Sequence, residues 1–470
     1  MRLESVFRML LDGIPLLLIA AVLILSVFAV GYLLIYRVIL KGTKRLKFSK
    51  VLWILLLVSY LGVLCMVTVF RPGEGWHMGR IYPLFYSYKS AWRSFNAMEW
   101  RNLILNIAMF VPFGFLLPMS FEFFQKFWKT YLAGFLVTFG IESAQLIFKM
   151  GVVECDDIFN NFLGVMIGYG FYAIVCLIVN LIKKRRHSIG KTLAFQIPFA
   201  ATILMFTVIF AAYHGKELGN LNLYSIEPVT AFEIISNKEY SANTQKAMVY
   251  KADILDKNRA DQMAEEFFSG SSSCIDETRT DYYDETAVYY TTDSRDIWIN
   301  YIGPTYDYTD FNVGFGNEKV AVEENAADGE IIDVLRQYGI FVPKETEFST
   351  NGDGIYYITV DHSLENGQLY DGVIRCTYYK NGVMGNINNS LIVAKPYKEF
   401  ELISEQEAFE KICNGEIKIL ISDEENVSVV VRDVSLSYEL DTKGYYQPVY
   451  VFLATAGNWE LGIEVPAVKQ

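Results

Sequence analysis

The sequence has few of the residues from which disulfide frameworks and metal sites are built. Its six cysteines form no C-x-x-C pair and no zinc-ligand spacing. The four histidines stand far apart, at His77, His187, His214 and His362. We therefore expect no metal site and no cofactor. Whether a single disulfide forms among Cys274, Cys376 and Cys413 stays open at this point.

A recognisable catalytic nucleophile is also missing from the sequence. The segment Ser269-Gly-Ser-Ser-Ser273 has the composition of a loop and lacks the G-x-S-x-G pattern of a hydrolase turn. An enzyme is for this reason the second of two hypotheses about the chain. Nothing in the sequence indicates a nucleic-acid partner, and we expect none.

Charge divides the chain into two parts near Tyr213. Residues 1–213 carry 21 Lys+Arg and 9 Asp+Glu, which leaves 20 basic and 44 acidic residues of the totals 41 and 53 in residues 214–470. Long apolar runs dominate the first part, whereas the second has the composition of a soluble domain. We predict a membrane α-helical bundle over 1–213, followed by a soluble α+β extracytoplasmic domain over 214–470.

Six apolar runs are long enough to cross a membrane as helices, because a span needs roughly 17–25 residues. We place them near residues 14–36, 51–70, 102–119, 131–148, 158–182 and 193–213. The first run is too long for the core of a signal peptide and lacks an A-x-A-like cleavage site. We therefore expect it to be retained as a transmembrane helix.

Two short loops without acidic residues indicate the orientation of these helices. Residues 41–50 and 183–192 each carry five basic side chains, and such loops stay in the cytoplasm. Four predicted helices separate the two loops, so both give the same topology. The amino terminus and everything after Tyr213 would then lie outside the cell. The loop 71–101, predicted outside, departs from the rule because it carries five basic residues and two acidic ones.

Polar side chains interrupt three successive apolar runs. In chain order they are Asn102, Asn106, Glu142, Gln145, Asp156, Asp157, Asn160 and Asn161. A carboxylate at the centre of a membrane helix costs about 2.5 to 3.5 kcal/mol on insertion scales. In the predicted topology all of these positions lie toward the outer face of the membrane. We therefore predict a site there.

Each of these residues also has a purely structural explanation. Asp156 and Asp157 precede an apolar run, as helix caps and first-turn acids do, and Asn160 can join helices by hydrogen bonds. Glu142 is harder to explain in this way, because a carboxylate at that depth must face the bundle interior, pair with a cation or stay protonated. We name Arg71 and Arg101 as its candidate partners.

Glycine and proline in the same runs indicate how the helices pack. Gly164 and Gly168 lie on one face of the fifth predicted helix, a pattern typical of membrane helices in close contact. Pro112 predicts a kink in the third, because proline removes a helical hydrogen bond. We expect that kink to shape packing rather than to open a pocket.

These motifs together resemble the VanZ-like family of membrane proteins over about residues 51–182. The segment Asn106-Ile-Ala-Met-Phe-Val-Pro-Phe-Gly-Phe-Leu-Leu-Pro118 is similar to the family's N-x-x-x-F-x-P-x-G-x-x-x-P signature, and Glu142-Ser-Ala-Gln145 to its E-x-x-Q helix. Asp156 to Gly168 resembles its D-D-x-x-x-N-x-x-G-x-x-x-G segment. Arg71-Pro72, with Pro83 and Phe85, resembles the element upstream. Ala108 departs from the larger aliphatic residue that is commoner there.

The resemblance implies a cell-envelope membrane protein of Gram-positive type, and it supplies no reaction. The family takes its name from an accessory protein of glycopeptide resistance that lowers sensitivity to teicoplanin-type drugs. A link to such antibiotic resistance is therefore an expectation for this chain too.

The sequence of the acidic part, residues 214–470, predicts strands and a few helices. Residues 287–291, 297–301 and 434–440 are rich in β-branched and aromatic residues or alternate in polarity. Asn381-Gly382 predicts a hairpin turn. Ser404 and Glu407 form a capping box that opens a helix ending before Gly415. Helical patterns recur near 258–268 and 329–339.

The end of the chain resembles a known class of external domain. The segments Gln447-Pro-Val-Tyr-Val-Phe452 and Val465-Pro-Ala467, with the helix near Glu405, resemble the YycH/YycI regulatory domains of Gram-positive bacteria, which contain PepSY-like helix-strand units. The resemblance implies that residues 214–470 sense or bind an envelope protein partner.

Two hypotheses follow for the function. In the first, a non-enzymatic bundle binds the headgroup of a membrane lipid or lipid-linked cell-wall precursor at the outer leaflet. In the second, an intramembrane enzyme acts on lipid-linked precursors, with Glu142 or Asp157 as general base and Arg71 orienting a phosphate. We favour the first. The binding residues would be Arg71, Asn102, Asn106, Glu142, Gln145, Asp156, Asp157, Asn160 and Asn161.

Overall fold

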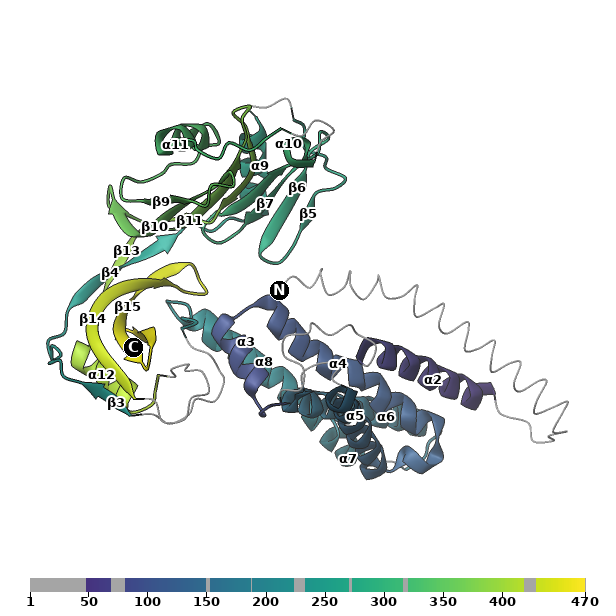
Figure 1. Cartoon of the computed structure of the whole chain (residues 1–470). Helices are drawn as coiled ribbons and strands as arrows, with labels where there is room; N and C mark the ends of the chain where they lie inside the picture. The colour runs from purple at the N-terminus through teal and green to yellow at the C-terminus, as the bar shows by residue number, and fades with distance from the viewer. Residues whose placement is uncertain are drawn as a thin grey trace. The chain divides into compact units, whose positions relative to one another are not determined.

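The chain forms two compact units, Met1–Glu217 and Leu218–Gln470. The computed structural model describes residues 48–68, 81–148, 153–186, 188–223, 233–269, 273–315, 320–417 and 428–469. Within these residues the first unit is helical and the second is rich in strands (Figure 1). The predicted fold class, a membrane helical bundle followed by an α+β domain, is confirmed at this level.

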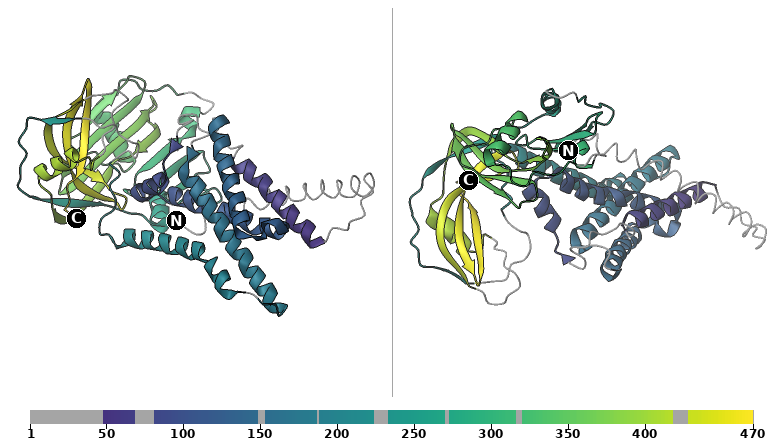
Figure 2. Two further views of the ribbon diagram at one scale, coloured as in Figure 1. Left: turned by 90° about the horizontal axis from the view of Figure 1, so that it is seen from below. Right: turned by 45° about the horizontal axis from the view of Figure 1, so that its top comes forward.

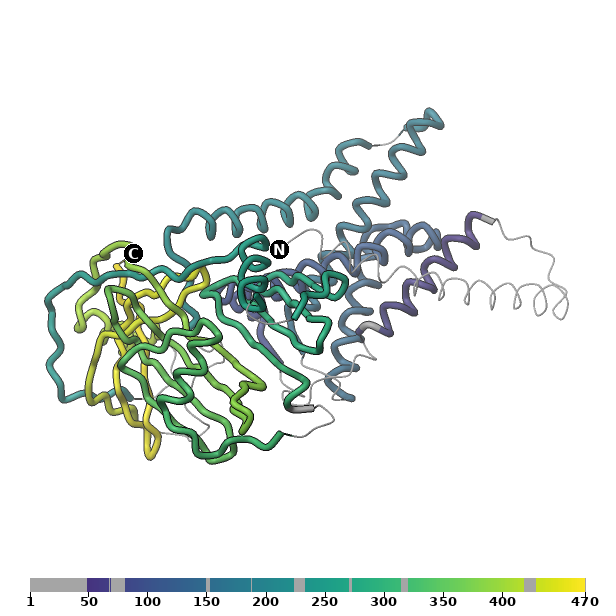
Figure 3. The backbone as a smooth tube through the Cα atoms, turned by 90° about the horizontal axis from the view of Figure 1, so that it is seen from above, coloured from purple at the N-terminus to yellow at the C-terminus, as the bar shows by residue number. Residues whose placement is uncertain are grey.

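Among the described residues, five helical spans are long and apolar enough to cross a membrane. They are α2 (Phe48–Thr68), α4 (Ala97–Ser120), α5 (Phe127–Phe148), α6 (Cys155–Ile182) and the pair α7 (Ile189–Ala194) and α8 (Ile197–Gly215). They correspond to the second to sixth predicted spans. The predicted span at 14–36 lies outside the described residues. Figure 3 shows the chain turning back between α6 and the pair α7–α8.

Short elements connect these helices. They are β1 (Ile81–Tyr82), α3 (Tyr86–Ser94), the 3-10 helix η2 (Glu122–Gln125) and β2 (Val153–Glu154). Strands β1 and β2 pair in parallel, which joins the segment before α3 to the segment before α6. Aromatic side chains of α3 and α4, among them Trp100, pack against Phe206 and Phe210 of α8.

Helices α4 and α6 approach each other backbone to backbone. A Cβ atom added at Gly164 would lie 2.1 Å from the Ile107 carbonyl oxygen, and one added at Gly168 would lie 2.0 Å from that of Val111. Only glycine tolerates such distances, so the close packing predicted from these two glycines is confirmed. Helix α4 continues through Pro112 to Ser120.

The second unit is built on one connected sheet. Its strands are β3 (Ile234–Ser236), β4 (Lys246–Ala252), β5 (Asp281–Tyr282), β6 (Thr286–Tyr290), β7 (Arg295–Asn300), β8 (Tyr306–Asp310), β9 (Glu347–Thr350), β10 (Ile355–Glu365), β11 (Gln368–Tyr378), β12 (Met384–Asn389), β13 (Ile392–Glu401), β14 (Val429–Leu440), β15 (Tyr445–Ala456) and β16 (Trp459–Pro466). The order along the sheet is β3-β14-β15-β4-β13-β11-β12-β8-β7-β6-β5, with β10 beside β11, β9 beside β10, and β16 beside β15. The antiparallel strands β14, β15 and β16 are drawn in yellow in Figure 2.

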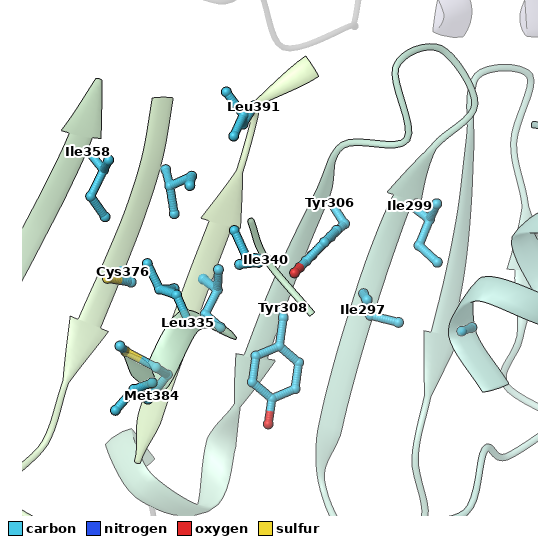
Figure 4. Packing of buried hydrophobic residues seen from close by; sticks show 14 of the residues in the cluster. Ile297, Ile299, Tyr306, Tyr308, Leu335, Ile340, Ile358, Cys376, Met384 and Leu391 are labelled. Carbon is cyan, nitrogen blue, oxygen red and sulfur yellow. The ribbon is translucent and has the colours of Figure 1, made fainter. Parts of the chain in front are cut away.

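Helices cover this sheet in two places and form two cores. In the first, α9 (Lys257–Phe268) and α11 (Asp328–Gln337) bury apolar side chains against strands β6–β8 and β10–β12, and part of this core is shown in Figure 4. In the second, α12 (Glu405–Cys413) packs Ala408 and Ile412 with Phe452 and Val465 of β15 and β16. Large β-branched and aromatic side chains fill both cores, as their enrichment in the strands predicts.

Most local predictions for the second unit are confirmed. The predicted helices and strands correspond to α9, α11, α12, β6, β7 and β14, and the predicted turn lies between β11 and β12, with Gly382 at φ 79°. Ser404 accepts a hydrogen bond from the Glu407 N–H at 3.1 Å, as a helix cap does. The polarity alternation on β14 does not produce a cleanly buried face, because Leu436 is exposed and Val434, Tyr438 and Leu440 are only half-buried. All six cysteines are free thiols.

Candidate functional site

Asp156, in the first turn of α6, caps a neighbouring helix. Its two carboxylate oxygens accept hydrogen bonds from the backbone N–H groups of Phe85 and Ser87, the latter at 2.8 Å. These groups lie at the start of α3, where backbone N–H groups have no partner within the helix. Asp156 is fully buried. Asp156 is predicted from the sequence to bind a ligand, but its carboxylate oxygens already accept hydrogen bonds from the backbone of α3.

Two further contacts fix α3 to α6. The Ser87 hydroxyl donates to Glu154 Oε2, and the Tyr88 hydroxyl donates to Asn160 Oδ1 at 2.5 Å. The pairing of β1 with β2 brings these segments together, since Tyr82 lies opposite Glu154. Glu154 lies just before the membrane-spanning part of α6. Burial raises the pKa of its carboxyl group, and the hydrogen bond from Ser87 opposes that rise.

Three carboxyl groups gather where α4, α5 and α6 meet. We call them the acid cluster: Glu142, Glu154 and Asp157. The backbone N–H of Glu154 faces the Glu142 carboxyl group, and the carboxyl groups of Glu154 and Asp157 are close enough to repel it electrostatically. Asn106 on α4 donates its amide to Asp157 Oδ1 at 2.5 Å. The tertiary structure thus brings together candidates from three different predicted spans.

Glu142 is a buried acid that the fold leaves incompletely paired. Its side chain is 3% exposed, and its Oε2 atom has no hydrogen-bond partner among the described residues. Asn160 and Asn161 are also buried, and each pairs only one end of its amide in the described structure, with Tyr88 and with Thr138 respectively. An unpaired buried polar group costs about 1 to 3 kcal/mol. A ligand that supplies the missing hydrogen-bond partners would therefore stabilise the protein most if it bound at these atoms.

The remaining candidates lie apart from the acid cluster or outside the described residues. Gln145 donates to the Thr68 carbonyl at 2.9 Å, which ties α5 to the end of α2. Asn102 is exposed on α4. Arg71 lies outside the described residues. Arg101, the other cation predicted to pair with the buried glutamate, has a buried Nε without a hydrogen bond in the described part of the chain.

Four residues that make the contacts of this region are not among the predicted site residues: Ser87, Tyr88, Thr138 and Glu154. Ser87 and Tyr88 belong to the segment 71–101, which is predicted only as an outer loop but contains α3. Glu154 carries a usable signal, because it stands two residues before Asp156 at the start of an apolar run. Thr138 has no such signal, since a threonine inside an apolar run is common in membrane helices.

The second unit contains a group of side chains with the geometry of a cation site. Asp361 and His362 on β10 and Asp371 on β11 place three potential ligand atoms within 4.8 Å of one another. The scattered histidines of the sequence do not predict this arrangement, which the β10–β11 hairpin creates. Asp361 is largely exposed, and exposed acidic groups of this kind are common without an ion.

Comparison with known proteins relates the first unit to a family. The VanZ/LLP1 family model matches residues 56–179, which include the acid cluster and the α4–α6 contact. No curated protein matches the chain.

Two solved structures that are similar to this chain match it with low TM-scores. An uncharacterized protein from Eubacterium rectale is 12% identical with a TM-score of 0.26, and the match covers 50% of this chain and 87% of that one. The YpeB C-terminal domain of Bacillus megaterium is also 12% identical with a TM-score of 0.20, and the match covers 46% of this chain and 100% of that domain.

The family match and the helical architecture agree on the same residues. The five apolar spans of the described structure include the matched region, and its signature glycines make the contact between α4 and α6. Residues 56–179 of this chain are therefore a VanZ-like region of a multi-pass membrane protein.

Proposed function

We propose that the first unit binds the polar headgroup of a membrane lipid or a lipid-linked cell-wall precursor at the outer leaflet, and that this binding contributes to tolerance of teicoplanin-type antibiotics. The observation that carries the proposal is the unpaired, buried Oε2 atom of Glu142 beside two other carboxyl groups. A helix bundle has no structural need for such an atom. Its cost is offset when a ligand supplies the missing hydrogen bond.

The site fits binding better than catalysis. Asp156 is held by backbone donors and Asp157 by Asn106, so two of the carboxylates in this region have partners that fix them. Glu142 is left as the candidate general base. None of the hydrogen-bond partners that the described residues offer to Glu142 is a nucleophilic side chain. A binding site needs only the arrangement that is present.

The second unit, in this proposal, lies outside the cell and recognises an envelope protein partner. This orientation follows from the basic loops at 41–50 and 183–192. The acidic composition of residues 214–470 suits an exposed domain that faces cationic envelope components.

The test compares the wild type with Glu142→Gln in a teicoplanin-sensitive host. Drug sensitivity and the turnover of lipid-linked precursors are measured together. Glu122→Gln is the matched control, because Glu122 is 83% exposed on η2 and, among the described residues, forms its one ion pair with Lys50. We expect the wild type and the control to protect, Glu142→Gln to lose protection, and precursor turnover to stay unchanged.

Other results would contradict the proposal. Equal protection by the wild type and Glu142→Gln would remove Glu142 from the function. Precursor chemistry that changes only when Glu142 is intact would favour an intramembrane enzyme. Western blots of the membrane fraction must show equal amounts of all three proteins, so that loss of protection is not loss of protein.

A further inference from the structure

The acid cluster has no counter-charge in the described part of the chain. Glu142, Glu154 and Asp157 repel one another, and Asp156 adds a fourth carboxylate next to them. No ion pair joins any of these four to a lysine or arginine of the described residues. Like charges held together in a partly dehydrated site are relieved either by taking up a proton or by binding a cation.

The spacing of the acids disfavours a single metal ion. A metal site needs several ligand atoms close to one another. Among the described residues, the group of three or more potential ligands that comes within 4.8 Å consists of Asp361, His362 and Asp371 in the second unit. The acid cluster does not reach this spacing. A larger cation that carries its own hydrogen-bond donors fits it better.

The unpaired atoms also describe the ligand. Glu142 Oε2 and Asn161 Oδ1 lack a donor among the described residues, whereas Asn160 Nδ2 lacks an acceptor. An ionised carboxylate and an amide oxygen both accept hydrogen bonds, so two of the three missing partners are donors. A primary ammonium group supplies three N–H donors and a positive charge. A phosphate supplies only acceptors and a negative charge, which three carboxylates would repel.

We propose that the acid cluster binds a primary ammonium group, so that the ligand's headgroup enters the site by its amine and not by its phosphate. This inference rests on the proposed function and narrows its ligand to amine-bearing headgroups. Two sources share this chemistry: an aminophospholipid of the bilayer, and a lipid-linked precursor that carries a free amine.

The experiment measures which lipids stay bound to the purified full-length protein. The protein is placed in phosphatidylcholine nanodiscs that contain equal amounts of phosphatidylethanolamine and phosphatidylglycerol, and the bound lipids are identified by native mass spectrometry. Phosphatidylcholine is the internal control, because its trimethylated nitrogen keeps the charge but has no N–H donor. A second preparation adds an amine-bearing, lipid-linked precursor.

We expect phosphatidylethanolamine or the amine-bearing precursor to be enriched roughly tenfold over phosphatidylcholine, the effect of one charge-assisted hydrogen bond. Which of the two is enriched identifies the source. Glu142→Gln should abolish the enrichment, and Glu122→Gln should preserve it. Circular dichroism of both variants in the same nanodiscs verifies that they are folded.

Three results would overturn the inference. The first is a preference for phosphatidylglycerol, which would leave the proposed function intact with an anionic ligand. The second is equal enrichment by the wild type and Glu142→Gln, or none by either. The third is enrichment that appears only in Arg71→Gln, because the chain's own arginine would then be the cation of the cluster. Failure of the proposed function shows separately, as unchanged drug tolerance in Glu142→Gln.

Discussion

Two buried acids, Asp441 of the second unit and Glu142 of the first, are paired in opposite ways. Asp441 of the second unit is 4% exposed, and its oxygens accept four hydrogen bonds, from the backbone N–H groups of Gly219, Lys443 and Tyr445 and from the Gln447 amide. Glu142 of the first unit is equally buried, but its Oε2 atom has no hydrogen-bond partner among the described residues.

This contrast separates an acid that stabilises the fold from the acid on which the proposed function rests. Asp441 closes the turn between β14 and β15 and ties it to Gly219, so its hydrogen bonds stabilise the fold. Asp156 has the same role in the first unit, where it caps α3. Burial alone therefore does not indicate a site, and a buried atom without a partner requires an explanation, which the proposed function supplies for Glu142.

The two units also differ in how their elements meet. In the first, glycines let the backbones of α4 and α6 touch, because lipid gives no hydrophobic force to press helices together and close packing must supply the attraction. In the second, large side chains fill the space between sheet and helices, because removing them from water provides the driving force. Substitutions should reveal the difference.

The largest effect is expected for Gly168→Val. Its Cβ would lie 2.0 Å from the Val111 carbonyl oxygen, a backbone atom that cannot move aside without separating α4 from α6. We expect a loss of about 3 kcal/mol, the upper end of the cost of overpacking. Thermal unfolding of the detergent-solubilised protein measures it.

Gly140→Ala is the matched control on α5, since a Cβ added at Gly140 meets nothing within 4 Å. Alanine is the better helix former, so this variant should be neutral or more stable by up to about 1 kcal/mol. Similar melting temperatures for Gly168→Val and wild type would show that the two helices are further apart than described.

A slightly smaller effect is expected for Asp441→Ala. The change leaves three backbone N–H groups without their acceptor, at a cost of about 2 to 3 kcal/mol. Amide hydrogen exchange should become faster at Gly219 and Tyr445. Glu142→Gln should leave exchange in the first unit unchanged. Equal destabilisation by the two substitutions would remove the distinction between paired and unpaired acids.

The smallest effect concerns the pH dependence of the second unit. Burial, together with the neighbouring Glu464 carboxyl group, raises the pKa of Glu439 to about 7. Because the folded protein holds this proton more tightly than the unfolded chain, stability is greatest below pH about 4.5 and falls as the pH rises to about 7. After allowance for solvent screening the loss is about 1 kcal/mol.

Glu439→Gln should flatten this part of the stability profile, because glutamine does not titrate. Urea unfolding at several pH values between 4.5 and 8 measures it, and Glu460→Gln, at an exposed position of β16, is the control. A slope that persists in Glu439→Gln would assign the pH dependence to another group.

Sequence alone determined the apolar spans of the membrane region and its resemblance to the VanZ-like family. Apolar runs of sufficient length must form helices in lipid, since only a helix pairs its own backbone groups there, and the spacing of glycine and polar residues carried the family signature. Local turn chemistry placed the capping box at Ser404 and the hairpin turn at Gly382 for the same reason: a few neighbouring residues decide such features.

The tertiary structure alone decided which buried acid has its hydrogen bonds completed. The sequence distinguishes Asp156 from Glu142 only by depth, since one precedes an apolar run and the other lies within one. Phe85 and Ser87, some seventy residues earlier, satisfy Asp156, while no described residue completes the pairing of Glu142. Hydrogen-bond pairing of a buried group depends on what long-range packing brings within about 3 Å of it, and no local pattern contains that information.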